Sequence, residues 1–244
     1  MCNLYAIMKS RDELTRWVDA LTDRNNNQPP MPGVYPDYAA PIVTRSEDGS
    51  RELRDVRWGM PSPKNVLVDA AGKRADKLRA RGGEVDFAAL LRLEPDRGVT
   101  NIRNAASSHW RPWLGAKHRC LVPFTSFSEP DQLGGSLQPV WFARDEGRPL
   151  AAFAGVWTPW TCVRKIKESE VSCDLFGILT TEANADVGAY HDKAMPVILA
   201  EASERDLWLS DAPWDEVKHL QRPLPDGALQ VVARGVKEDE TLPA

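Results

Sequence analysis

Cysteine and histidine are scarce in this sequence. Its 244 residues include four cysteines and four histidines. The cysteines form no C-x-x-C pair, and the spacing of cysteine and histidine matches no zinc site. Four cysteines in a chain of this length are also too few for a disulfide framework. We therefore expect free thiols, no bound metal and no cofactor. The residues concerned are Cys2, Cys120, Cys162, Cys173, His109, His118, His191 and His219.

Long apolar runs are also missing. Residues 3–20 carry charged side chains from Lys9 to Arg16, so they lack the apolar core of a secretory signal peptide. No stretch approaches the roughly 20 apolar residues that a membrane-spanning helix needs. These absences predict a cytoplasmic protein with reduced thiols and no membrane partner.

The formal net charge is −4, which excludes a uniformly basic surface suited to indiscriminate nucleic-acid binding. The segment 64–111 differs, because it holds ten Lys or Arg against six Asp or Glu. Two readings of this segment stay open. It is either a basic face on an acidic protein or a solvated insertion of mixed charge.

What the sequence does contain is a series of short elements. Apolar runs of β-favouring residues between 118 and 200 are divided by Gly, Pro or charged turns, which favours antiparallel strands. Ser10 and Glu13 form a capping box that predicts a helix over 11–21. The pattern predicts one α+β domain over 1–236, with a helical excursion at about 64–98 and a disordered tail over 237–244. The other elements predicted are a strand at 2–8, helices at 68–81, 85–93, 202–209 and 213–220, and a strand at 229–236.

The cysteine at position 2 has a chemical meaning that an internal cysteine lacks. Removal of Met1 would leave Cys2 with a free α-amine and a thiol on neighbouring carbons. The reference pKa values, near 7.7–8.0 for the amine and about 8.5 for the thiol, make both groups partly nucleophilic at neutral pH. Such a pair condenses with an aldehyde to a thiazolidine ring. A terminal cysteine can instead attack an amide, or it can be a small apolar residue with no role.

Several motifs resemble those of the SOS response-associated peptidase (SRAP) family, whose members act on abasic sites in DNA. The family's Met-Cys-Gly-Arg start resembles Met1-Cys2-Asn3-Leu4, and its Trp-Gly-Leu-Ile-Pro stretch resembles "WGMPSP" at Trp58. Further matches are "NIR" from Asn101, "RCLVPFTSFSEP" with Glu129, "AFAGVW", and "YHDKAMPVIL" with His191. Asn3 and Leu4 depart from the family's Gly-Arg, Pro130 replaces a Trp, and the histidine motif is one residue longer.

The resemblance implies a mainly antiparallel, barrel-like β core flanked by helices, and a site built around Cys2. In this scheme Cys2 forms a thiazolidine crosslink with the ring-opened abasic deoxyribose of single-stranded DNA and so shields the lesion. The proposed catalytic residues are Cys2, Asn101, Glu129 and His191. Glu129 and His191 move protons, and Asn101 orients the reacting group, although Asn104 competes for this role.

The resemblance also implies a set of DNA contacts. Arg103 and Lys193 are predicted to hold phosphates, and Trp58 to stack on a base beside the lesion. The expected partners are single-stranded DNA with abasic sites and the replication machinery. We expect a monomer that associates with the nucleoid when bound to DNA, and that removes its own Met1.

Two other function classes stay open at this level. An N-terminal-nucleophile amidohydrolase would use Cys2 to attack an amide, with Asn101 in the oxyanion site. A non-covalent DNA-binding module would use Trp58 and the basic segment alone, and its binding would be reversed by salt.

Overall fold

The structure is a computed structural model that describes residues 3–20, 22–23 and 29–240. Five strands form a closed barrel at its centre. Antiparallel pairing runs from β5 through β4, β7 and β10 to β11, and a short parallel pairing of β11 with β5 closes the ring. The barrel strands are β4 (Ala39–Arg45), β5 (Arg51–Trp58), β7 (Arg119–Phe124), β10 (Ala151–Val163) and β11 (Glu170–Thr181).

A second, antiparallel sheet of five strands contains both the first and the last strand of the described chain. Its order is β14-β9-β8-β1-β3. The strand β1, close to the N-terminus, therefore lies between β8 and β3, and β14 forms one edge. These strands are β1 (Tyr5–Ile7), β3 (Met31–Val34), β8 (Ser126–Pro130), β9 (Pro139–Ala143) and β14 (Gln230–Arg234).

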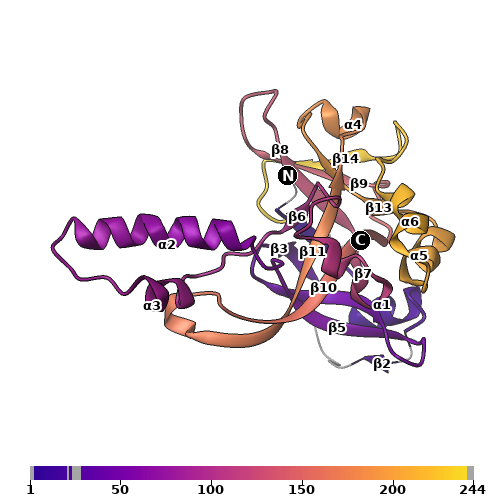
Figure 1. Ribbon diagram of the computed structural model, residues 1–244. Helices are drawn as coiled ribbons and strands as arrows, with labels where there is room; N and C mark the ends of the chain where they lie inside the picture. The colour runs from indigo at the N-terminus through magenta and orange to yellow at the C-terminus, as the bar shows by residue number, and fades with distance from the viewer. Residues whose placement is uncertain (1–2, 21, 24–28, 241–244) are drawn as a thin grey trace.

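Short strands and helices complete the fold. The helices α5 and α6 lie on one side of the barrel, and α2 projects from the opposite side (Figure 1). The short strands are β2 (Thr22–Asp23), β6 (Asn101–Ile102), β12 (Met195–Pro196) and β13 (Ile198–Leu199). The α-helices are α1 (Arg11–Trp17), α2 (Lys64–Arg79), α3 (Phe87–Arg92), α4 (Ala185–Gly188), α5 (Ala202–Leu209) and α6 (Trp214–Val217). Single 3₁₀ turns are η1 (Arg111–Trp113), η2 (Ala116–His118), η3 (Ile166–Glu168) and η4 (Lys218–Leu220).

The predicted fold class is confirmed: the domain is α+β with a mainly antiparallel, barrel-like core. The core is continuous from β1 into the barrel, where the ring of Tyr5 packs edge-on against Trp58 and Phe153. Apolar side chains on the inner faces of both sheets bury each other, which supplies most of the driving force for this arrangement.

Helix α1 shows how local signals act here. Ser10 and Glu13 form the predicted capping box. The helix ends at Trp17 rather than at residue 21, because Asp19 adopts a positive φ of 51°, which a continuing right-handed helix cannot accommodate.

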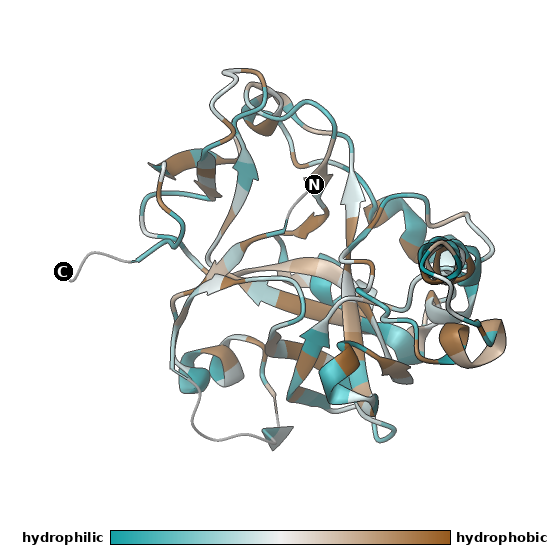
Figure 2. Cartoon of the chain, turned by 90° about the vertical axis from the view of Figure 1, so that its left-hand side faces the viewer, coloured by the Kyte–Doolittle hydropathy of each residue, from teal (hydrophilic) through white to brown (hydrophobic). Residues whose placement is uncertain are grey.

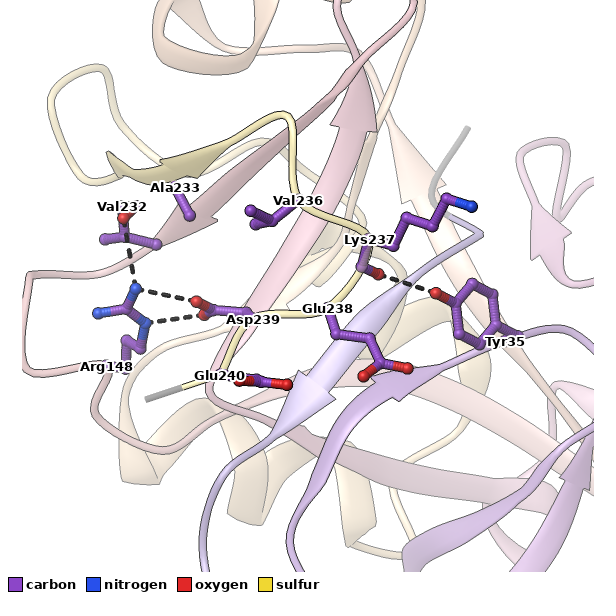
Figure 3. A pocket seen from close by; sticks show the side chains of 9 residues that line it. All are labelled: Tyr35, Arg148, Val232, Ala233, Val236, Lys237, Glu238, Asp239 and Glu240. Carbon is purple, nitrogen blue, oxygen red and sulfur yellow. Dashed lines mark hydrogen bonds and ion pairs between the residues drawn. The ribbon is translucent and has the colours of Figure 1, made fainter. Parts of the chain in front are cut away.

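The disordered tail predicted to begin at residue 237 is wrong for residues 237–240. The Asp239 side chain is buried and accepts two hydrogen bonds from Arg148, at 2.7 and 2.9 Å. The Tyr35 hydroxyl donates to the carbonyl of Lys237 at 2.8 Å (Figure 3). A buried ion pair outweighs the acidic, turn-rich composition that predicted disorder. The domain boundary at residue 236 stays a prediction.

Candidate functional site

Glu129 is a carboxylate placed in the interior by strand β8. It pairs with Val140 of β9, and its side chain is 0 % exposed. Burial raises the pKa of this carboxyl to about 7, because the charged form loses hydration inside the protein. At neutral pH the group can therefore both accept and donate a proton, which is what general acid–base chemistry requires.

His191 lies beside Glu129, with 3.8 Å between Nε2 of the imidazole and Oε2 of the carboxyl. The histidine is 1 % exposed and follows α4, where its backbone N–H donates to Val187 at 2.8 Å. Burial lowers the pKa of the imidazole, and the positive charge of Lys193 lowers it further. The ring is thus mostly neutral at pH 7, so its contact with Glu129 is not a strong ion pair.

Tyr190 holds His191 against the hairpin that carries Glu129. Its carbonyl accepts backbone hydrogen bonds from Gln132 at 3.0 Å and Leu133 at 3.1 Å, just beyond the end of β8. Its ring packs on Phe142 of β9. The sequence gives no sign of this role, because a tyrosine before a histidine has no defined spacing to a loop some sixty residues earlier.

Asn101 lies in β6, which pairs in parallel with β11. Its Nδ2 donates to Oδ1 of Asn3 at 3.1 Å and to Oγ1 of Thr100 at 2.8 Å. The Thr100 hydroxyl donates to the same Asn3 oxygen at 2.9 Å. Asn104, by contrast, is exposed. The geometry favours Asn101 over Asn104, because Asn101 contacts the residue next to Cys2.

Cys2 itself lies outside the described residues. The chain that follows it is fixed at two places. Asn3 is held by Thr100 and Asn101, and the carbonyl of Leu4 accepts a hydrogen bond from the Ser128 N–H at 2.9 Å. Asn3 and Thr100 belong to the candidate site, and the sequence did not point to them, because no local pattern links positions so far apart in the chain.

Arg103 and Lys193 lie together at the surface near His191. Nη1 of Arg103 makes a long contact of 3.5 Å with the carbonyl of Lys193, and both side chains are exposed. Glu182 lies 3.8 Å from Arg103 and is itself exposed, so solvent screens this pair. The two cations are accessible to an anion.

The predicted stacking role of Trp58 is wrong. The side chain is 0 % exposed, its ring lies 5.1 Å from Tyr5 and stacks on Phe176, and its Nε1 donates to the carbonyl of Thr100 at 3.2 Å. Burial of this large ring in the core outweighs any surface role. Trp58 instead supports the backbone at Thr100.

We also searched residues 3–20, 22–23 and 29–240 for metal sites and membrane-spanning helices. These residues contain no group of three or more His, Cys, Asp or Glu side chains placed to hold a metal ion. In the same ranges, none of the helices combines the length and apolar character that crossing a bilayer requires.

Solved structures share this fold. A crystal structure of a protein from Bordetella bronchiseptica is 25 % identical, covers 94 % of this chain and 97 % of its own, and has a TM-score of 0.62. A protein from Bacteroides thetaiotaomicron is 20 % identical, with coverage of 94 % and 90 % and a TM-score of 0.63. A phage-related protein, also from Bordetella bronchiseptica, is 20 % identical, with coverage of 94 % and 92 % and a TM-score of 0.59.

Sequence comparison gives the family. None of the curated proteins matches the chain. The family described as SOS response associated peptidase (SRAP) matches residues 96–238, which include Asn101, Glu129 and His191 but neither Cys2 nor the helices α2 and α3. Because this match covers more than half of the 244 residues, the chain belongs to the SRAP family, a group associated with the SOS response to DNA damage.

Proposed function

We propose that this protein captures abasic sites in single-stranded DNA as a covalent thiazolidine formed by Cys2. The observation that carries the proposal is the convergence of Asn101 and Glu129 on the chain that follows Cys2. Asn101 contacts Asn3, and the residue before Glu129 bonds to Leu4. Because Cys2 is bonded directly to Asn3, and consecutive Cα atoms are about 3.8 Å apart, the proposal assigns Asn101 and Glu129 to the chemistry of Cys2.

The chemistry requires no oxidant, reductant or metal. The α-amine nitrogen of Cys2 adds to the aldehyde carbon C1′ of the ring-opened deoxyribose, and loss of one water gives an imine. The sulfur then adds to the imine carbon while the thiol proton passes to the nitrogen, which closes a five-membered ring. Closing the ring removes the imine, which would otherwise acidify the neighbouring carbon and lead to strand cleavage by β-elimination.

Glu129 is suited to the proton transfers of imine formation. A carboxyl with a pKa of about 7 can take a proton from the Cys2 ammonium group and give one to the departing hydroxyl. The neutral imidazole of His191 acts as acid or base on the sugar hydroxyl that forms when the deoxyribose ring opens. The Nδ2 of Asn101 donates to Asn3 and to Thr100, which fixes the orientation of its amide beside the residue that follows Cys2.

Binding of the strand is assigned to Arg103 and Lys193. Lys193 lies two residues after His191, and Arg103 contacts the carbonyl of Lys193, so the two exposed cations suit phosphates on either side of the lesion. A single strand is the preferred substrate because its sugar is reachable without base flipping. Removal of Met1 by hydrolysis of the Met1–Cys2 bond must come first, because a retained Met1 makes the Cys2 nitrogen a peptide amide. We assign this step to the protein itself, in keeping with the peptidase name of its family.

The test is a crosslinking assay with protein whose intact mass shows that Met1 is absent. Mixed with single-stranded DNA that bears one abasic site, it should give an adduct that survives denaturant. Peptide mass mapping should place the adduct on Cys2. C2A should abolish the stable adduct, whereas C162A, which removes a free thiol elsewhere in the fold, should leave the yield unchanged. An equally durable adduct with C2A, or an adduct on another residue, would disprove the proposal.

A further inference from the structure

The helices α2 and α3 form a projection that contributes little to the core. We call residues 64–92 the arm; it extends away from the barrel (Figure 1). Ala71 and Ala75 are the buried residues of α2, and α3 has none. Seen end-on, α2 is largely hydrophilic (Figure 2). Because the arm buries so little apolar surface, its contribution to stability is small and its exposed surface is its main feature.

The root of the arm is nevertheless fixed firmly. The buried Asp96 carboxylate accepts hydrogen bonds from the Ser62 hydroxyl at 2.6 Å, the Ser62 N–H at 3.0 Å and the Gly98 N–H at 2.8 Å. The guanidinium of Arg164, also buried, donates to the carbonyl of Gly59 at 3.2 Å. The Asp96 contacts join the two ends of the arm to each other. Arg164, in the turn between β10 and β11, also donates to the carbonyl of Arg97 at 3.2 Å, so both ends are tied to this hairpin.

The root of the arm lies next to the proposed site. Val99 and Met60 exchange backbone hydrogen bonds of 2.7 and 3.0 Å across the root. Thr100 and Asn101, which hold Asn3, follow directly. DNA bound at Asn101 would therefore pass close to the root of the arm.

The outer surface of the arm is basic. Lys73 and Lys77 lie one turn apart on α2 and Arg81 lies in the turn after it, and all three are exposed. Within the described part of the chain, Lys73, Lys77 and Arg81 form no ion pair with an acidic side chain. This holds even for Asp69, which lies on the same face of α2. Asp76, by contrast, pairs with Arg79 at 3.1 Å. Such cations stand out on a protein whose net charge is −4.

We propose that the arm binds the phosphate backbone of duplex DNA next to the abasic site, through Lys73, Lys77 and Arg81. This inference rests on the proposed function for its placement of the lesion. Duplex DNA is favoured because cations without aromatic partners suit backbone contacts, whereas single-strand binding combines cations with stacking side chains. Phe87 is the one aromatic residue of the arm, and it is half-buried.

The experiment compares the triple variant K73A/K77A/R81A with the control triple R16A/K117A/K218A, which removes the same charge from exposed positions outside the arm. Affinity is measured against salt concentration for DNA that carries a tetrahydrofuran analogue of the abasic site. The analogue has no aldehyde, so binding is measured without the covalent step. Failure of the crosslink in a separate assay would count against the proposed function alone. Three DNA substrates are compared, in which the lesion is flanked by a duplex, by a single strand of equal length, or by a few nucleotides only.

The arm variant should lose affinity for the duplex-flanked DNA alone. The slope of log K against log salt should become shallower by about 0.9 for each phosphate contact that is lost. An arm variant that matches the control triple on duplex-flanked DNA overturns the proposal. So does an equal loss on the single-strand flank or on the short DNA, because the arm would then not act through a duplex.

Discussion

At the scale of single residues, the site depends on one carboxyl whose properties come from burial. Glu129 is fully enclosed, and its pKa is raised to about 7. The burial that raises this pKa also makes the ionised form of the carboxyl unfavourable in the folded protein. Asn3 and Asn101 contribute through fixed hydrogen bonds and not through titration.

This burial predicts a pH-dependent stability. The folded protein keeps the Glu129 proton up to about pH 7, whereas the unfolded chain releases it near 4.5, so the stabilisation is complete below pH 4.5 and is lost as the pH rises through 7. E129Q cannot ionise. Its free energy of unfolding relative to wild type should therefore rise by about 3 kcal/mol between pH 4.5 and 7, measured by urea unfolding. E182Q is the control. Hydrogen bonds lower the pKa of the exposed Glu182, so the free energy of unfolding of E182Q relative to wild type should fall, and not rise, with increasing pH. A constant difference between E129Q and wild type across this range contradicts the assignment.

At the scale of elements, the root of the arm depends on close backbone approach. Gly98 has a φ of +77°, and a Cβ there would lie 2.6 Å from Nη1 of Arg164 and 2.7 Å from the carbonyl oxygen of Gly59. Gly82, at the other end of the arm, has a nearly equal φ of +78° with nothing within 4 Å of the same position. An alanine at Gly82 therefore introduces backbone strain alone, whereas an alanine at Gly98 introduces the same strain together with steric crowding.

G82A should cost about 1 kcal/mol, the strain of a left-handed backbone with a side chain. G98A should cost a further 1–3 kcal/mol, because the buried Arg164 and the carbonyl of Gly59 must both move. Urea unfolding of the two variants measures the difference. Equal losses for G82A and G98A would mean that the root is not tightly packed.

At the scale of the whole molecule, the sheet that carries Glu129 is assembled from both ends of the chain. Strand β1 pairs with β8 and β14 with β9. The segment after β14 is held through Asp239, which accepts hydrogen bonds from Arg148 (Figure 3). Asp239 also accepts a hydrogen bond from the Ser126 hydroxyl of β8. The C-terminal segment thus supports the strand on which the carboxyl stands.

Loss of this fastening should weaken the whole domain. D239A leaves Arg148, whose side chain is 17 % exposed, without its carboxylate partner, and should lower the free energy of unfolding by about 3 kcal/mol. E240A changes the neighbouring exposed carboxylate and should stay within about 0.5 kcal/mol of wild type. Comparable stability of D239A and E240A in urea would show that the C-terminal segment does not brace the sheet.

The sequence by itself determined the local features and the family. The capping box of α1, the helix Ala202–Leu209 and the antiparallel pairing follow from residues close together in the chain, and ordered motifs led to the SRAP family. Tertiary structure alone decided the closure of the barrel by β5 and β11, the burial of Trp58 and the raised pKa of Glu129. Local propensities depend on a few neighbouring residues, whereas burial and pKa depend on which distant segments meet.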